Sequence, residues 1–305
     1  MGSDPYAGHY INLDRSVERR QRLEQQFAKF GLQNLYRRIP ATDGQNLAPR
    51  PGLTPGERGC FHSHMSILQQ SLQATKPVHI LEDDAVLSEH VAPTIELIAR
   101  TGVLGSFDLV FTDMFVPPDV RAIKQLKALC DKALTATRFD PANLQVIDLA
   151  PVNFSAASSY VVNPKSVERM LQLCKQEWDA GPTKAWDIFL RREVNKGRLR
   201  AACLLPFVTS IDLDWIGRST IGRRSGVASA GETNEAGRQQ RSSGASPLVM
   251  SIIRYSFFVD RDLENYAGPM LAAVLADTVD KDKDPQRDLI AGALRFVLSD
   301  SYRQF

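Results

Sequence analysis

Over the first third of the chain, the spacing of apolar positions alternates between the pattern typical of β-strands and the pattern typical of amphipathic helices. The segment 9–13 is β-like, and the residues 17–30 place Leu23 and Phe27 on one face of an amphipathic helix. A second short strand is predicted over 36–41, where the turn sequence Thr-Asp-Gly follows. This strand–helix–strand order favours an α/β fold with parallel strands.

A helix start follows the next Pro/Gly-containing loop. Thr54 can serve as the N-cap, Pro55 fits the first helical position, and Glu57 completes a capping box. This helix is expected to run to about Leu72, and a buried strand is predicted over 78–81. The remaining predictions are strands over 107–112, 158–162 and 204–210, helices over 164–175 and 186–194, and no clear assignment over 117–145.

The composition changes after about residue 221. Residues 222–247 contain few large apolar side chains, which indicates a flexible loop or linker rich in Gly, Ser and Arg. The chain is therefore divided into an α/β domain over 1–221, this linker, and a helical segment over 248–305 that packs on the domain. The apolar stretch 248–258 could instead form a dimer contact or touch an anionic membrane surface.

Composition and charge narrow the class of protein. The chain has 305 residues, 43% of them hydrophobic, which is enough for a sizeable core. Its formal net charge of +2 gives no argument for nucleic-acid binding. The four cysteines are widely spaced without a C-x-x-C pair, which favours a reducing compartment and argues against a structural zinc site. No secretory signal or apolar stretch of about 20 residues is visible, so a cytoplasmic protein is expected.

Three consecutive acids, Glu82, Asp83 and Asp84, follow the strand predicted over 78–81. Their charges repel one another, so water, Lys/Arg partners or a metal ion must compensate them. Ligands of open α/β sheets bind beyond the carboxyl ends of the strands, and Asp113 could end a neighbouring strand at the same edge. Carboxylates there suit Mg²⁺ or Mn²⁺, which could in turn hold a diphosphate. The alternative is a solvated turn with one acid as a helix cap, and the three acids alone favour that alternative.

The surrounding sequence resembles glycosyltransferase family 25, which includes bacterial lipopolysaccharide galactosyltransferases and animal collagen galactosyltransferases. Four blocks match in the family's order, and two weaker ones follow. The four are I-N-L-D-R-S-V-E-R-R at 11–20, I-P-A-T-D-G at 39–44, L-T-P-G-E-R-G-C-F-H-S-H at 53–64 and I-L-E-D-D at 80–84. The weaker ones are A-A-S-S-Y-V-V-N-P-K-S-V-E-R-M-L at 156–171 and A-W-D-I-F-L at 185–190, and nothing aligns beyond about residue 220.

The resemblance implies a GT-A type fold: a Rossmann-like nucleotide-sugar-binding domain with a mostly parallel central sheet. It also implies a divalent metal and an inverting transfer of a hexose, galactose or glucose, from a UDP-sugar. The acceptor would be a lipopolysaccharide or lipooligosaccharide glycan or a lipid-linked glycan, and a peripheral contact with the inner membrane is compatible with such an acceptor. Sugar, acceptor and linkage stay open.

The resemblance also assigns roles to the acids. Asp84 takes the direct metal contact, and Glu82 stands at the other position of a D-x-D-like pair. Glu82 or Asp83 would serve the ribose or hold the metal ligands in place. If an ion and a diphosphate complete the site, the three acids should cluster near solvent, left unpaired by the protein and without a Lys or Arg that neutralises all of them.

Seven further residues are candidates for the nucleotide side: Asn12, Arg15, Arg19, Thr42, Asp43, Ser63 and His64. A guanidinium after the first strand could pair with phosphate or stack on uracil. The resemblance places Ser63 and His64 toward the donor. The alternatives are that Arg19 belongs to the wet side of a helix, that Asp43 lies in a plain turn, and that His64 is structural.

An inverting transferase needs a base that deprotonates the acceptor hydroxyl. Asp187 is the first candidate, because its segment matches the family's later acidic region, and Asp113 is the second. Trp186 could offer an apolar face to a sugar ring. Asp187 could instead N-cap the helix that follows. The Ala-Trp pair at 185–186 and the missing glycine at 156–159 depart from the family pattern on the acceptor side.

Two alternatives to an active transferase stay open. One is a catalytically weak nucleotide-sugar-binding protein that keeps the fold, since the second half of the chain diverges. The other is a different metal-dependent enzyme that uses the same acids at the strand ends to act on nucleotides.

Overall fold

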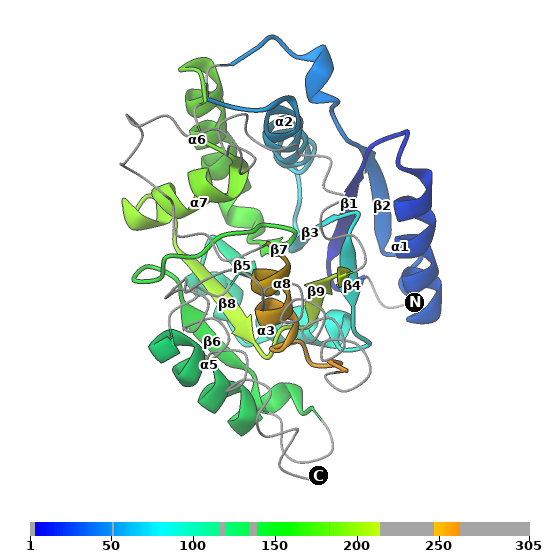
Figure 1. The fold of residues 1–305 in the computed structure, drawn as a ribbon, viewed down its shortest axis with the longest axis vertical. Coiled ribbons are helices and arrows are strands. Elements are labelled where there is room, and N and C mark those ends of the chain that lie inside the picture. Colours follow the sequence, from blue (N-terminus) through cyan, green and yellow to red (C-terminus); the bar gives the residue numbers. More distant parts are fainter. Residues whose placement is uncertain are drawn as a thin grey trace, which may run out of the picture.

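A seven-stranded mixed sheet forms the centre of the protein (Figure 1). The computed structural model describes residues 4–50, 52–115, 120–133, 139–182, 184–213 and 247–262. The sheet order is β2 (Tyr36–Pro40), β1 (Ala7–Asn12), β3 (Val78–Glu82), β7 (Ser159–Val162), β5 (Leu109–Phe111), β8 (Ala201–Leu205) and β6 (Gln145–Asp148). β7 and β6 run opposite to the other five strands, so the predicted mostly parallel, Rossmann-like α/β sheet is confirmed.

The first unit of the fold is β1–α1–β2, as the hydrophobic pattern predicts. Helix α1 (Val17–Lys29) buries Leu23 and Phe27 against the sheet. Gly31 follows with φ of +71°, in the left-handed region that suits a glycine after a helix end. The parallel pairing of β1 with both β2 and β3 brings the carboxyl ends of three strands to one edge.

Helix α2 (Pro55–Gln70) begins with the predicted capping box. The Glu57 amide donates to Thr54 Oγ1 at 3.1 Å, and the Thr54 amide donates to Glu57 Oε2 at 2.8 Å. The start of α2 also lies close to the loop after β2. A Cβ built on Gly44 would lie 1.6 Å from the carbonyl oxygen of Pro55, so only glycine fits there.

Helices cover both faces of the sheet. Ile80 of β3 packs into a core with α2, α6 (Val167–Asp179) and α7 (Trp186–Asn195), whereas the next residue, Leu81, packs with α1 and α3 (Val91–Arg100). The short helix α4 (Val103–Ser106) joins the second core, and α5 (Val120–Ala133) lies beside β8 and β6. Because both faces of each central strand are buried, these strands appear as continuous apolar runs in the sequence.

Several elements differ from the predictions. β7 lies antiparallel between β3 and β5, so the strands that carry Glu82 and Asp113 are not neighbours. The predicted extended run 204–210 is divided between β8 and β9 (Thr209–Ile211), and β9 pairs with β4 (Ala85–Leu87) in a separate two-stranded ribbon directly after the three acids. The unassigned region contributes α5 and β6, and α6 follows a 3-10 turn at Pro164–Ser166.

The C-terminal part is described only over 247–262. Helix α8 (Pro247–Tyr255) contacts β9, and Phe258 forms a β-bridge with Phe207. The linker predicted over 222–247 lies outside the described residues up to 246, as does the predicted helical segment after residue 262. In the part of the chain that the structure describes, no helix is long and apolar enough to cross a membrane.

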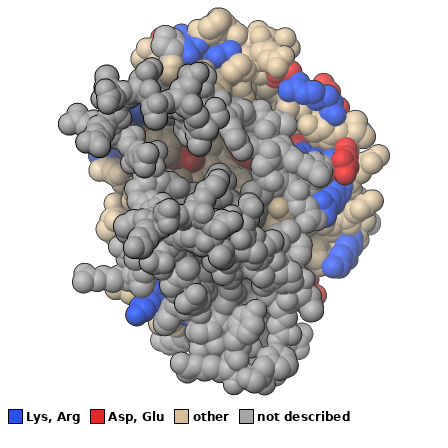
Figure 2. Space-filling view, viewed as in Figure 1, with Lys and Arg blue, Asp and Glu red and all other residues tan. Residues whose placement is uncertain are grey.

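The described surface carries both signs of charge. In Figure 2, Lys and Arg side chains gather on the side of the molecule that α1 forms, with Asp and Glu among them. Helix α1 itself contains Glu18 and Glu24 beside its basic residues.

Candidate active site

A pocket opens at the carboxyl ends of β1, β2 and β3. Its cavity volume is about 110 Å³, and it is open to solvent. The walls come from the loops after β1 and β2, the first turns of α2, and the three acids after β3. Ten of the predicted site residues line it: Asn12, Arg15, Arg19, Thr42, Asp43, Ser63, His64, Glu82, Asp83 and Asp84. The other three predicted residues, Asp113, Trp186 and Asp187, are not part of this lining.

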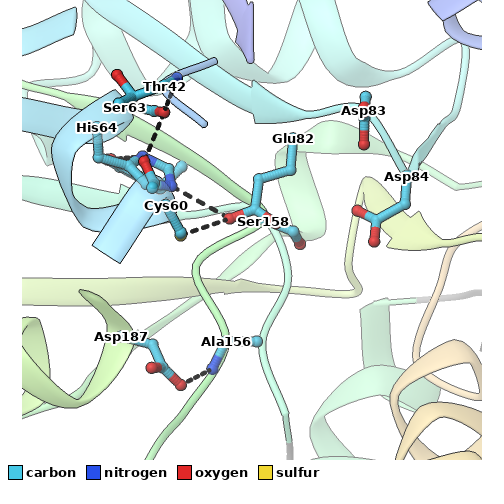
Figure 3. A network of polar contacts seen from close by, with 12 residues as sticks. Thr42, Cys60, Ser63, His64, Glu82, Asp83, Asp84, Ala156, Ser158 and Asp187 are labelled. Atoms are coloured by element: carbon cyan, nitrogen blue, oxygen red, sulfur yellow. Dashed lines mark hydrogen bonds and ion pairs between the residues drawn. The ribbon is translucent and has the colours of Figure 1, made fainter. Parts of the chain in front are cut away.

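Glu82 ends β3 and faces helix α2 (Figure 3). Its Oε1 lies 3.1 Å from His64 Nε2 and 3.6 Å from Cys60 Sγ. Burial by itself raises the pKa of Glu82, but the hydrogen bond and charge of His64 outweigh it, and the net pKa lies below the usual value. Glu82 is therefore held as a carboxylate by two side chains from one turn of α2.

Asp83 is paired by the protein. Asn12 Nδ2 donates to its Oδ2 at 2.7 Å, and Arg19 Nη1 donates to its Oδ1 at 2.9 Å. The Arg19 side chain is only 8% exposed, so it does not belong to the wet side of α1. Burial raises the pKa of Asp83, against the influence of Arg19. The expectation that the protein leaves all three acids unpaired is therefore wrong for Asp83, and equally for Glu82.

Asp84 is the least compensated of the three acids. Its Oδ1 is buried without a hydrogen-bond partner among the described residues, and its Oδ2 lies 3.8 Å from Arg19 Nη1. Burial and the neighbouring Glu82 raise the pKa of Asp84 to about 7. A buried carboxylate oxygen without a hydrogen-bond partner among the described residues is the kind of ligand that a divalent ion with oxygen ligands takes, so these acids fit such an ion. Arg19 forms ion pairs with both Asp83 and Asp84, whereas Glu82 is paired with His64.

Asp113 follows β5 at the same sheet edge but does not line the pocket. Its carboxylate is fully buried and forms an ion pair with Arg254 of α8, which also contacts Ser158. Burial raises the pKa of Asp113, and Arg254 opposes this effect. Because the carboxylate is committed to Arg254, Asp113 is not placed to accept a proton from a substrate.

Arg254 was not among the predicted site residues. It lies 141 positions after Asp113 in the chain, beyond the last block that resembles the family. Nothing in the local sequence around Arg254 indicates that it pairs with Asp113.

Asp187 occupies the first turn of α7, where Ala185 is the N-cap. Its Oδ2 accepts a hydrogen bond from the amide of Ala156 at 3.0 Å (Figure 3). The alternative that Asp187 caps α7 is therefore wrong. Ala156 has φ of +69°, in the left-handed region that favours glycine, and Asp187 fixes this turn.

Trp186 does not offer a face to the pocket. Its side chain is 1% exposed and stacks on the His64 ring, with centroids 4.9 Å apart and planes 3° from parallel. It also meets Phe61 edge to face at 5.3 Å. The apolar face of α7 packs on α2, which turns the indole inward and away from a sugar.

The loop after β2 is fixed against α2. Ser63 Oγ accepts from the amide of Thr42 at 2.8 Å, and Thr42 Oγ1 lies 2.8 Å from His62 Nδ1. Asp43 caps the 3-10 turn Gly44–Asn46 and pairs with Arg15, whose side chain is 55% exposed. The Gln45 amide and Arg15 hold the pKa of Asp43 below its usual value. Ser63 is thus a buried support, whereas Arg15 can move to meet a ligand.

Comparisons with known proteins show the family to which the chain belongs. The family model for glycosyltransferase family 25 (LPS biosynthesis protein) matches residues 8–189, more than half of the chain. A "Glycosyltransferase 25 family member" of Drosophila pseudoobscura pseudoobscura is 34% identical over 122 residues. That alignment covers 33% of this chain and 19% of the relative, so the chain spans a small part of the relative's length. The matched residues 8–189 include the whole pocket lining and Asp187, but not Arg254.

Proposed function

The chain belongs to glycosyltransferase family 25, and we propose on this basis that it is a metal-dependent, inverting hexosyltransferase with a UDP-sugar as donor. The observation that carries this proposal is the buried, unpartnered oxygen of Asp84 beside Glu82, in a pocket at the carboxyl ends of the parallel strands. A pair of carboxylates at this edge, one of them with an oxygen that no described residue hydrogen-bonds, suits a cation that in turn binds a diphosphate.

Asp84 and Glu82 are the residues that would hold Mn²⁺ or Mg²⁺. When bound, such an ion stabilises the negative charge that develops on the leaving UDP. Arg19 and Asn12 keep Asp83 in place, and this arrangement fixes the backbone that presents Asp84. The side-chain amide of Asn12 therefore holds Asp83 in position within the site. Asp83 could still accept a hydrogen bond from a ribose hydroxyl on the side that faces the pocket.

The nucleotide would lie between the loops after β1 and β2. Arg15 is exposed and can leave Asp43 to pair with a phosphate or stack on uracil. Thr42 and Asp43 form the facing wall, and their positions are set by Ser63 and the capped 3-10 turn. This side of the pocket is largely preformed, which lowers the entropic cost of binding.

Asp187 is the better candidate for the general base. It is half-buried near the acid edge and its orientation is fixed by the Ala156 amide, whereas Asp113 is occupied by Arg254. In the transfer, the acceptor oxygen would attack C1 of the sugar from the face opposite UDP while Asp187 takes its proton. The bond from C1 to the UDP oxygen breaks as the new glycosidic bond forms, so the configuration at C1 inverts.

The family description supports a bacterial surface glycan as acceptor, since it refers to an LPS biosynthesis protein. We propose lipopolysaccharide or lipooligosaccharide, or a lipid-linked precursor, as the acceptor class. A cytoplasmic protein in peripheral contact with the inner membrane would meet such an acceptor. Galactose and glucose are the candidate sugars.

A donor screen tests this proposal. The protein is incubated with Mn²⁺ and a panel of UDP-sugars, and UDP release is measured with and without a lipooligosaccharide acceptor. Release from UDP-galactose or UDP-glucose above the other donors supports the transferase. UDP binding without release from any donor favours a nucleotide-sugar-binding protein, and release of phosphate or nucleotide from other substrates favours a different metal-dependent enzyme.

A further inference from the structure

Cys60, His64 and Glu82 bring three different metal-ligand types to one point (Figure 3). Their Sγ, imidazole nitrogen and carboxylate oxygen all lie within 4.8 Å of one another. Cys60 and His64 are one turn apart on α2, so they share a face of the helix, and Glu82 approaches from the end of β3.

The imidazole of His64 is fixed in the orientation that such a site requires. Its Nδ1 lies 2.8 Å from the Tyr160 hydroxyl, which leaves Nε2 aimed at Glu82. The Trp186 indole stacks on the same ring and sets its plane. Metal-bound histidines commonly have their second nitrogen held by such an outer partner.

The three ligand atoms of Cys60, His64 and Glu82 favour a different ion from the one proposed at Asp84. A thiolate and an imidazole suit Zn²⁺, which is bound by Cys, His and Asp/Glu in tetrahedral sites, whereas Mg²⁺ and Mn²⁺ prefer oxygen ligands. Three protein ligands leave the fourth position open. That position faces the pocket, because Cys60, His64 and Glu82 all line it.

The surroundings of Cys60 determine the state of its thiol. Burial in the first place, and then the carboxylates of Glu82, Asp187 and Asp84, raise the pKa of the thiol well above its usual value. Binding of Zn²⁺ through the sulfur would therefore displace the thiol proton.

We propose that Cys60, His64 and Glu82 form a Zn²⁺ site in the lining of the pocket, next to the oxygen-ligand site at Asp84. The site takes Zn²⁺ with a solvent or substrate oxygen as fourth ligand, and the thiol proton is released to water as the Zn–S bond forms. Glu82 is shared between the two sites, so Zn²⁺ should compete with Mn²⁺ for it. This competition rests on the proposed function, whereas the zinc site itself does not.

The competing interpretation is that Cys60 and His64 only hold Glu82 by hydrogen bonds. Titration of the full, metal-stripped chain with Zn²⁺ against a chromophoric chelator decides between the two. Co²⁺ in place of Zn²⁺ gives a second readout, because a thiolate ligand produces a charge-transfer absorption. The wild type is expected to bind one Zn²⁺ tightly and to show the Co²⁺–thiolate band.

Three variants assign the site. Cys60→Ser should lose the Co²⁺–thiolate band and weaken Zn²⁺ binding by at least about 100-fold, because outer partners alone are worth about 10- to 100-fold in affinity. Tyr160→Phe removes such a partner and should weaken Zn²⁺ binding by about 10- to 100-fold while it keeps the band. Asp84→Asn should keep the band and one bound Zn²⁺, since Asp84 supplies no ligand to this site.

Absence of stoichiometric Zn²⁺ binding by the wild type, or an unchanged Co²⁺ band in Cys60→Ser, would overturn the proposal. If Cys60→Ser does not fold, the wild-type band and the Tyr160→Phe affinity still decide. Mn²⁺-dependent UDP binding by the wild type is measured in parallel, so failure of the zinc site and failure of the donor site give different results.

Discussion

Asp113 and Arg254 form a buried ion pair that joins the family-matched domain to helix α8. The Asp113 carboxylate is fully buried and the Arg254 side chain is 2% exposed. Arg254 also contacts Ser158, which ends the turn held by Asp187. Arg254, a residue from outside the family match, therefore supports Asp113 and Ser158 at the sheet edge that also carries the three acids.

Replacement of Arg254 tests this support. Arg254→Met leaves the Asp113 charge buried without a partner and should lower the free energy of unfolding by about 3–5 kcal/mol. The double variant with Asp113→Leu should recover part of this loss, because neither charge then remains in the core. Urea denaturation measures all three proteins.

An exposed ion pair supplies the control for Arg254. Arg100 and Glu96 lie 3.9 Å apart on α3 with side chains 69% and 49% exposed. Arg100→Ala should change the free energy of unfolding by less than about 0.5 kcal/mol. Equal effects of Arg254→Met and Arg100→Ala would contradict the structural role of Arg254.

His79 gives the protein a specific pH dependence. Its ring is fully buried between the Tyr36 hydroxyl, 2.6 Å from Nδ1, and the Ser159 hydroxyl, 3.0 Å from Nε2. Burial lowers the pKa of His79 from 6.5 to about 3. Below about pH 6.5 the unfolded chain takes up a proton at this residue that the folded protein does not, so stability falls as the pH drops toward 3.

The variant His79→Gln isolates this effect from other groups that titrate in acid. The unfolding free energy of the wild type minus that of the variant should be largest near pH 7 and shrink by on the order of a few kcal/mol toward pH 3. Thermal or urea unfolding between pH 3 and 8 measures it. A difference that stays constant over this range would show that His79 is not held neutral by burial.

Asp187 is tested by separating binding from transfer. Asp187→Asn should leave UDP binding unchanged and lower the rate of transfer about 10²- to 10⁴-fold, as loss of a general base does. Asp179→Asn at the exposed end of α6 is the matched control and should retain full transfer. Full activity of Asp187→Asn would exclude it as the base.

Local sequence signals predict the elements of the fold better than their arrangement. The capping box at Thr54 and the turn at Gly31 depend on neighbouring residues, and both are found as expected. The antiparallel insertion of β7 between β3 and β5 depends on pairing between distant strands, which no local pattern encodes. The ribbon of β4 and β9 joins segments about 120 residues apart for the same reason.

The residues of the site also divide into those that local sequence blocks predict and those that depend on long-range packing. The resemblance located ten residues that line one pocket, because those blocks lie on loops at one sheet edge. It did not reveal that Trp186 faces inward or that Arg254 pairs with Asp113, since both depend on how α7 and α8 pack. The one-turn spacing of Cys60 and His64 is visible in the sequence, but their convergence with Glu82 requires the fold.

The central claim is that Asp84 holds a divalent ion that binds the UDP diphosphate. The most direct test is calorimetric titration of UDP into the wild type and Asp84→Asn, each with Mn²⁺ and with a chelator. The wild type should bind UDP more tightly with Mn²⁺, and Asp84→Asn should lose at least about 10-fold of that gain while its binding in chelator stays unchanged. Equal UDP affinity of the wild type with and without Mn²⁺, or an Asp84→Asn variant with the full Mn²⁺ effect, would contradict the account.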